Sequence, residues 1–271
     1  MKPIQTQSNP TSIHEDEWQK LKQFTDARIA LGRAGCSIPT KAMLDFQLAH
    51  AQAKDAVYQD LDTHLLSTKL EKLGLNSIVI QSQAADKATY LKRPDLGRQL
   101  NTESTQKLKQ YRDKKPETYD VLIVIGDGLS AFAIEQNAVN LIASLKNEIE
   151  LNGWKIAPII ISLGSRVALG DHVAEILNVK MLVMMIGERP GLSSPDSMGI
   201  YYTYNAKSGS SDAERNCISN IRPAGLSIQI ATHRLINLMQ NSQKLGYSGV
   251  NLKDDHEIPT ITQSQIPKQL F

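Results

Sequence analysis

The chain has 271 residues, of which 41% are hydrophobic, 21% charged and 5% aromatic, and it contains 16 glycines and 11 prolines. These proportions are those of an ordinary globular protein and exclude a disordered or collagen-like chain. The 30 lysines and arginines are almost balanced by 28 acidic residues, which leaves a net charge of +2. This balance gives no field strong enough to hold a polyanion, so nucleic acid is not an expected partner.

The absence of a recognisable targeting signal and the spacing of the cysteines indicate a reducing compartment. The N-terminal residues include no apolar segment of the signal-peptide kind, and no run of about 18 apolar residues occurs that could span a membrane. Cys36 and Cys217 lie far apart and outside any CxxC pair, which is typical of free thiols and not of a zinc site or disulfide scaffold. We therefore expect a cytosolic protein with no membrane partner.

The first part of the chain is predicted to be mostly helical. Residues 1–14 are polar and contain Pro3 and Pro10, so we expect a flexible tail there. Two stripes with helical spacing follow. The first is Trp18, Leu21, Thr25 and either Arg28 or Ile29, and the second is Phe46, His50, Ala53, Val57, Leu61 and His64. A strand-like run at 78–81 leads through a loop to a basic helix at 104–113, and the loop and helix are interpreted as a connector. The basic side chains around that helix are expected to form a solvated face.

Residues 116–252 have the pattern of an α/β domain. The expected strands and helices lie, in chain order, at 121–125, 130–152, 156–161, 171–178 and 181–186. The strand runs are almost continuously apolar, which is typical of strands covered on both faces. This order predicts a Rossmann-like or flavodoxin-like open parallel sheet, with residues 15–115 as its helical N-terminal extension and connector. Residues 253–271 are expected to form a C-terminal tail.

Each predicted strand ends in a polar loop that contains glycine. These loops are Gly126-Asp127-Gly128-Leu129-Ser130, Gly164-Ser165-Arg166-Val167 and Gly187-Glu188-Arg189-Pro190-Gly191. Glycine permits close approach, and the N–H groups and hydroxyls could hold a phosphate or the amide arms of a large polar ligand. The loops lack the dinucleotide fingerprint and the P-loop pattern. Each alone could be an ordinary turn, but three loops at one sheet edge favour a ligand site.

Two other patterns imitate catalytic chemistry. The segment Asp62-Thr63-His64-Leu65-Leu66-Ser67 ends in serine where the D-x-H-x-x-G pattern of some cobalamin proteins has glycine. We interpret His64 as a histidine on a packed helical face, and His50 in the same way. The pair Asp171-His172 is similar to a catalytic base and its orienting acid, but it lies where a helix should start, so Asp171 is interpreted as the N-cap of that helix. No paired carboxylates, metal-ligand spacing or nucleophile elbow was found, so we predict no catalytic and no metal-binding residue on this chain.

Several longer motifs occur in a fixed order between about Arg28 and Asn251. They are Leu31-Gly32-Arg33-Ala34-Gly35, Tyr90-Leu91, Arg93-Pro94-Asp95-Leu96-Gly97-Arg98, Asp127-Gly128-Leu129-Ser130, Arg166-Val167, Gly187-Glu188-Arg189-Pro190-Gly191-Leu192, Cys217-Ile218-Ser219-Asn220-Ile221 and Ser248-Gly249-Val250-Asn251. In these motifs the chain resembles the small (light) chain of ethanolamine ammonia-lyase, an adenosylcobalamin-dependent family. Residues 1–27 and 252–271 lie outside the resemblance.

The resemblance implies a subunit that is inactive by itself. A separate large chain, a (β/α)8 barrel, would bind ethanolamine and carry out its radical conversion to acetaldehyde and ammonia. The small chain would hold adenosylcobalamin against the barrel mouth. The resemblance also implies a hetero-oligomer of six large and six small chains in the cytoplasm, within a bacterial microcompartment.

The family's cofactor-binding positions fall on Val167, Glu188 and Cys217. Each also has an ordinary interpretation: Val167 as a core residue, Glu188 as a solvated loop acid and Cys217 as a small buried thiol. Glu188 is expected to project from a turn braced by Pro190 into the crevice beyond the strand ends. Because the axial-histidine pattern is incomplete, the cofactor is expected to keep its own benzimidazole as lower ligand, the base-on state.

Two functions of other classes stay open from the residues alone. A stand-alone cobalamin or nucleotide carrier without catalytic activity would use the same loops. A stand-alone Rossmann-like enzyme would use the same sheet, although the dinucleotide fingerprint is missing. Co-purification with a large chain distinguishes the subunit from both.

Overall fold

The computed structural model describes Ile13 and residues 15–253, so the expected tails lie outside the described residues except for Ile13 and Lys253. The helices are α1 Thr40–Tyr58, α2 Thr63–Lys72, α3 Lys87–Lys92, α4 Thr102–Lys114, α5 Ala131–Leu151, α6 Leu169–Leu177 and α7 Ile228–Leu245. The strands are β1 Ser77–Gln81, β2 Val121–Gly126, β3 Ile159–Leu163, β4 Met181–Gly187, β5 Met198–Tyr204 and β6 Arg215–Ile221. Short 3-10 helices are η1 Glu17–Phe24, η2 Leu96–Arg98, η3 Asp212–Glu214 and η4 Gly249–Asn251.

The six strands form one mixed sheet in the order β1-β3-β2-β4-β5-β6. The first four of that order run parallel, which confirms the predicted β2, β3 and β4. The expectation of an entirely parallel sheet is wrong, because β5 pairs antiparallel with both β4 and β6. β1 comes from the stretch expected to lead into a connector, and it pairs with β3 at the opposite edge.

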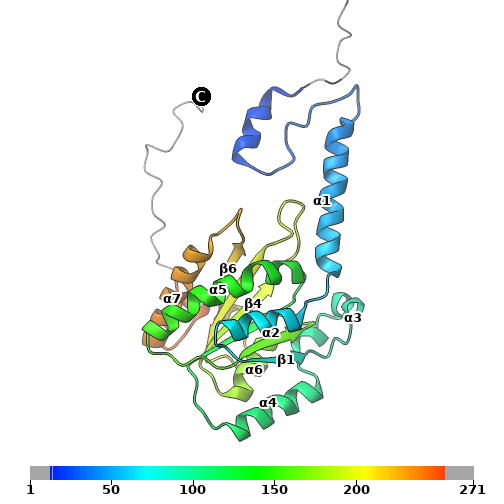
Figure 1. Ribbon diagram of the computed structural model, residues 1–271. Coiled ribbons are helices and arrows are strands. Elements are labelled where there is room, and N and C mark those ends of the chain that lie inside the picture. Colours follow the sequence, from blue (N-terminus) through cyan, green and yellow to red (C-terminus); the bar gives the residue numbers. More distant parts are fainter. Residues whose placement is uncertain (1–12, 14, 254–271) are drawn as a thin grey trace, which may run out of the picture.

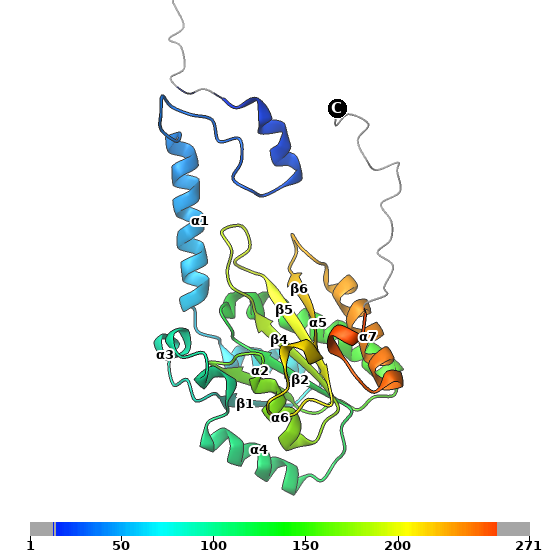
Figure 2. The same cartoon turned by 180° about the vertical axis from the view of Figure 1, so that it is seen from behind.

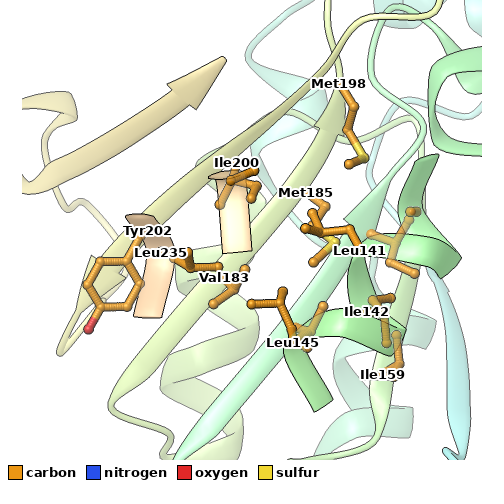
Figure 3. Packing of buried hydrophobic residues seen from close by; sticks show 14 of the residues in the cluster. Leu141, Ile142, Leu145, Ile159, Val183, Met185, Met198, Ile200, Tyr202 and Leu235 are labelled. Carbon is orange, nitrogen blue, oxygen red and sulfur yellow. The ribbon is translucent and has the colours of Figure 1, made fainter. Parts of the chain in front are cut away.

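Helices cover both faces of this sheet (Figures 1 and 2). One core contains side chains of α2, α5 and α7, and the other contains side chains of α4 and α6. Successive residues of β2 alternate between the two cores, with Ile123 in the first and Leu122 in the second. Figure 3 shows Leu145 of α5 beside Val183 of β4 in the first core. Coverage on both faces explains why the central strands have no polar alternation.

The ends of α5 follow from its sequence. The Ser130 side chain accepts a hydrogen bond from the backbone N–H of Ala133 at 3.1 Å, as expected of an N-cap. Asn152 is the C-cap, and Gly153 after it has a φ of +71°, a left-handed conformation that glycine adopts without strain. The predicted helix is confirmed.

The predicted start of α6 is wrong. The helix begins at Leu169, and Ala168 at the N-cap makes no side-chain hydrogen bond. Asp171 is buried inside the first turn, where its carboxylate accepts two hydrogen bonds from Arg215, each 2.6 Å long. A capping residue and a buried acid look alike in sequence because the partner lies 44 residues away.

The described residues before α2, which include η1 and α1, form an arm that projects from the rest of the structure (Figures 1 and 2). We call the remainder, from α2 onward, the body. The base of the arm is tied to α5, because Glu135 accepts hydrogen bonds from the Gln59 side chain at 2.7 Å and the Asp62 backbone at 3.0 Å. Farther along, Arg28 donates to the Leu192 carbonyl at 3.3 Å, which links the arm to the loop after β4. None of the helices within residues 13 and 15–253 combines the length and the apolar character needed to cross a membrane.

The predicted packing of the two stripes is only partly right. The first stripe forms η1, a 3-10 helix that ends at Phe24 and buries no residue. The second is interrupted between α1 and α2, and its members Ala53 and Leu61 are buried. His50 and His64 are exposed, so their placement on a packed face is wrong. Among the members of this stripe, the buried ones lie toward the base of the arm, where the helices meet the body.

The basic side chains around α4 are solvent-exposed, which confirms their interpretation as a solvated face, namely Lys107, Lys109, Arg112, Lys114 and Lys115.

Candidate functional site

The three strand-end loops meet at the carboxyl ends of β2, β3 and β4, as predicted. Asp127 joins the first two loops, because its buried carboxylate accepts the backbone N–H groups of Gly128, Gly164 and Ser165 at 2.8, 2.9 and 3.0 Å. The backbone N–H of Leu129 donates to the Gly187 carbonyl at 3.0 Å and joins the first loop to the third. The β2 loop therefore fixes the spacing of the other two.

Charged groups beneath the loops reinforce this arrangement. Lys87 on α3 donates from Nζ to the Gly128 carbonyl at 3.1 Å. Burial lowers the pKa of Lys87 and raises the pKa of Asp127, while the three N–H donors around Asp127 oppose the second shift. Both groups are engaged by the loop backbone, so their role is to hold the loops in place.

Val167 and Glu188 border one open cavity of about 390 Å³. The full lining is Tyr90, Leu129, Arg166, Val167, Ile186, Gly187, Glu188, Arg189 and Tyr201. A second cavity of about 530 Å³ adjoins it and shares Arg166, Val167 and Tyr201. We call these two adjoining cavities together the strand-end hollow.

Glu188 has a structural tie in addition to its place at the cavity. Its Oε2 atom accepts a hydrogen bond from the buried Ser197 hydroxyl at 2.5 Å and another from the Asn220 backbone at 3.2 Å. It thereby links the loop after β4 to β5 and β6. The interpretation as a freely solvated loop acid is wrong, because the sequence does not reveal that β5 and β6 return to this point.

Cys217 lies on β6 directly opposite Tyr201 of β5. The residue is exposed, so its interpretation as a small buried thiol is wrong. Loss of hydration around the sulfur raises the pKa of the Cys217 thiol, and the Tyr201 hydroxyl opposes the shift. Burial also raises the pKa of Tyr201 to about 12. Through Tyr201, Cys217 reaches the rim of the strand-end hollow.

Sequence reasoning missed two aromatic residues of the hollow. Tyr201 belongs to β5, which was not predicted, and Tyr90 belongs to α3 within the expected connector. Tyr90 is 1% exposed, and the Arg166 guanidinium lies 4.2 Å from its ring centroid. The only sequence signal for Tyr90 was its membership of a family motif, since a tyrosine in a short helix has no local pattern.

The described residues around the strand-end hollow offer groups that can bind a ligand. Within residues 13 and 15–253, no three His, Cys, Asp or Glu side chains gather closely enough to hold a metal ion. Around the hollow lie apolar side chains, hydroxyls, backbone groups, a carboxylate and arginines. This set can take a large ligand that carries both hydrogen-bond donors and acceptors.

Fold and site together define an α/β protein that offers an open polar binding surface at the carboxyl ends of its strands. Residues 15–253 match the family model described as "Ethanolamine ammonia-lyase light chain (EutC)". The chain belongs to this family, whose members are small subunits of a lyase.

Curated relatives agree over most of their length. The ethanolamine ammonia-lyase small subunit of Pseudomonas putida (strain W619) is 48% identical over 255 residues, which cover 94% of both chains. That of Pseudomonas syringae pv. tomato is 49% identical over 244 residues, 90% of this chain and 85% of the relative. That of Pseudomonas fluorescens (strain Pf0-1) is 47% identical, with 91% and 90% covered.

Proposed function

We propose that this lyase subunit holds adenosylcobalamin against a large catalytic subunit, with Val167, Glu188 and Cys217 as cofactor-binding residues. The observation that carries the proposal is that Val167 and Glu188 border the strand-end hollow, while Cys217 lies directly opposite Tyr201, which also borders it. The sheet around β2, β3 and β4 supports the same function, because Rossmann-like and flavodoxin-like folds bind ligands beyond the carboxyl ends of their strands.

The residues present fit this cofactor. The side arms of a corrin ring are neutral amides, which need hydrogen-bond donors and acceptors, and the ring itself needs a wide and partly apolar surface. Glu188 supplies an acceptor, Val167 an apolar contact, and the backbone near Cys217 both donors and acceptors. The Tyr90 hydroxyl and the Arg166 Nε are buried without a hydrogen-bond partner in the described part of the chain, so polar capacity is left for a ligand.

The role of this chain's own residues is to orient and shield. When bound, adenosylcobalamin supplies a cobalt–carbon bond whose homolysis starts the radical reaction. Ser197 and Asn220 hold the Glu188 carboxylate in one position, and Asp127 holds the loop that carries Val167. A rigid wall on one side of the ligand excludes water once a second subunit closes the other side.

The cofactor is proposed to bind base-on. Neither cavity of the strand-end hollow has a histidine among its described lining residues. His64 lies on α2, which contributes to the core on the opposite side from α6. Electron paramagnetic resonance of the cob(II)alamin form with ¹⁵N-labelled histidine tests this. Coupling to a histidine nitrogen would contradict the base-on state.

The partner is proposed to be a (β/α)8 large chain, in an assembly of six large and six small chains within a bacterial microcompartment of the cytoplasm. The name of the relatives, small subunit, implies a partner large subunit and nothing finer. The exposed apolar side chains of α1 offer surface for it, among them Met43, Leu44, Phe46 and Leu48.

Reconstitution tests the proposed function. The purified chain is mixed with the large chain and adenosylcobalamin, and acetaldehyde formation from ethanolamine is measured. Turnover should require both chains, and the two should co-elute at micromolar concentration. Turnover by this chain alone would contradict the proposal. Tight cobalamin binding by a chain that never associates with the large chain would instead support the carrier function.

A further inference from the structure

Arg166, immediately before Val167, is held in one position in the wall of the strand-end hollow. Its backbone N–H donates to the Gly97 carbonyl at 2.8 Å, and its guanidinium stacks on Tyr90 and donates from Nη2 to the Tyr90 carbonyl at 3.3 Å. Gly97 leaves room for the side chain, because a Cβ there would lie 2.9 Å from the Arg166 Cγ. The entropy of ordering a long side chain is thus already lost in folding.

The charge of Arg166 has no acidic partner. Among residues 13 and 15–253, no carboxylate forms an ion pair with it, and its buried Nε makes no hydrogen bond. Arg215, which borders the same hollow, is neutralised by Asp171 at 2.6 Å and Asp212 at 3.2 Å. A rigid arginine with free donors in a cavity wall is the arrangement that recognises an anion.

A second arginine places the anion on one side of the hollow. Arg98 borders the cavity of about 530 Å³ together with Arg166, Ser210 and Ser211. Its side chain makes no ion pair with a described residue. The carboxylate of Glu188 borders only the other cavity, and Asp212 is engaged by Arg215. Positive charge therefore exceeds negative charge on the Arg98 side.

We propose that Arg166, assisted by Arg98, forms a subsite for a phosphate group of the bound cofactor. The inference rests on the proposed function, since adenosylcobalamin carries one anionic phosphodiester, between its corrin ring and its benzimidazole nucleotide. All other polar arms of the corrin are neutral amides. The guanidinium of Arg166 donates to the phosphate oxygens, and Arg98 adds charge from the adjoining wall.

Three corrinoids that differ in the phosphate test this subsite. Adenosylcobinamide lacks the phosphate, adenosylcobinamide phosphate has the phosphate without the nucleoside, and adenosylcobalamin has both. Each is titrated into the complex of the two subunits, and the dissociation constant is measured by absorbance. Arg166→Gln should weaken the two phosphate-bearing ligands by about tenfold and leave adenosylcobinamide within about twofold. Arg98→Gln should give the same pattern at about threefold.

Control variants separate charge from folding. Arg112→Gln removes a surface charge that borders neither cavity and should leave all three dissociation constants unchanged. Arg166→Lys keeps the charge but loses the planar fork, so its loss should be smaller and should still be confined to phosphate-bearing ligands. If Arg166→Gln fails to assemble, Arg98→Gln, at an exposed position, decides the matter.

The outcomes distinguish this inference from the proposed function. Equal weakening of all three ligands would overturn the phosphate subsite but not the proposed cofactor-binding function. Arg166 would then contact the corrin ring or stabilise the cavity wall. A loss confined to adenosylcobalamin would also overturn it and would assign the contact to the nucleoside. If the wild-type complex binds none of the three, the proposed function fails, and the subsite fails with it.

Discussion

The sheet body and the N-terminal arm use apolar residues in opposite ways. In the body, both faces of the central strands are buried by helices of the same chain. On the arm, Leu44 and Leu48 of α1 are 57% and 60% exposed, and Trp18 is 68% exposed. Burial of one leucine side chain contributes about 1.5–3 kcal/mol to stability. The exposed side chains of the arm do not gain this free energy within the chain itself. The body is organised to fold by itself, and the arm is organised to meet another surface.

The largest effect is expected from the buried ion pair of the body. Asp171→Ala leaves Arg215 buried without its main partner, which should lower the free energy of unfolding by about 3–5 kcal/mol. Asp212→Ala, at a 92% exposed side chain that contacts the same Arg215, should change it by less than about 0.5 kcal/mol. Urea denaturation of the isolated chain measures both. Similar losses for the two variants would show that Asp171 is not a support of the body.

A smaller effect is expected where the body meets the strand-end hollow. Glu188→Ala leaves the buried Ser197 hydroxyl without its acceptor and should cost about 1–3 kcal/mol of stability. Glu188→Gln keeps an acceptor oxygen and should mainly reduce cobalamin affinity, by about 1 kcal/mol. Titration of the reconstituted complex and thermal melting of the isolated chain separate the two effects.

The matched control for Glu188 is its exposed neighbour. Arg189→Gln alters the same loop and should leave the melting temperature unchanged, because Arg189 is an exposed side chain. Unchanged cobalamin affinity in Glu188→Gln, together with a large drop in melting temperature, would make Glu188 a purely structural residue.

Substitutions on the arm should reduce association with the partner subunit and leave the stability of the isolated chain unchanged. Leu44→Gln and Leu48→Gln should each change the free energy of unfolding of the isolated chain by less than about 0.5 kcal/mol. Each should weaken association with the large subunit by about tenfold, because that partner would bury these side chains. Lys54→Gln, also exposed on α1, is the control. A marked loss of stability without any loss of association would refute the division between body and arm.

The smallest effect is expected for the reactivity of the two cysteines, Cys36 in the arm and Cys217 in the body. Cys217 should react slowly with iodoacetamide at neutral pH, because its raised pKa lowers the thiolate fraction at any given pH. Its reaction should reach half-maximal rate above about pH 8.5, the value for an ordinary thiol. Tyr201→Phe should move that midpoint further upward, because the hydroxyl no longer stabilises the thiolate. Cys36 on the arm is the exposed reference for peptide mass spectrometry, and a Cys217 midpoint at the ordinary value would contradict this pKa shift.

The central strands were predictable because they are continuously apolar. β2, β3 and β4 have helices on both faces, so nearly every position is buried and the runs stand out. β5 and β6 were missed because tyrosine, threonine, asparagine and arginine interrupt their apolar residues. Arg215 at the start of β6 is buried, and Asp171 is its buried ion-pair partner. Such a pairing depends on tertiary structure and leaves no local pattern.

The meeting of the strand-end loops could also be predicted, since parallel strands place their carboxyl ends at one edge. The links that hold the site together could not. Glu188 reaches Ser197 and Asn220 only because the antiparallel strands return to the sheet edge. Tyr90 reaches Arg166 because α3 passes beneath the loop after β3. Neither contact has a spacing rule that a sequence could display.

The position of β1 has a consequence for synthesis on the ribosome. Among the described strands, β1 pairs only with β3, from Ser77 opposite Ile159 to Gln81 opposite Leu163, and β2 and α5 are made between them. Translation proceeds at about 5–20 residues per second, so β1 waits several seconds for its only neighbour in the sheet. During that time its backbone N–H and C=O groups are open to pairing with other chains. The nascent chain therefore carries β1 without any strand neighbour until β3 emerges.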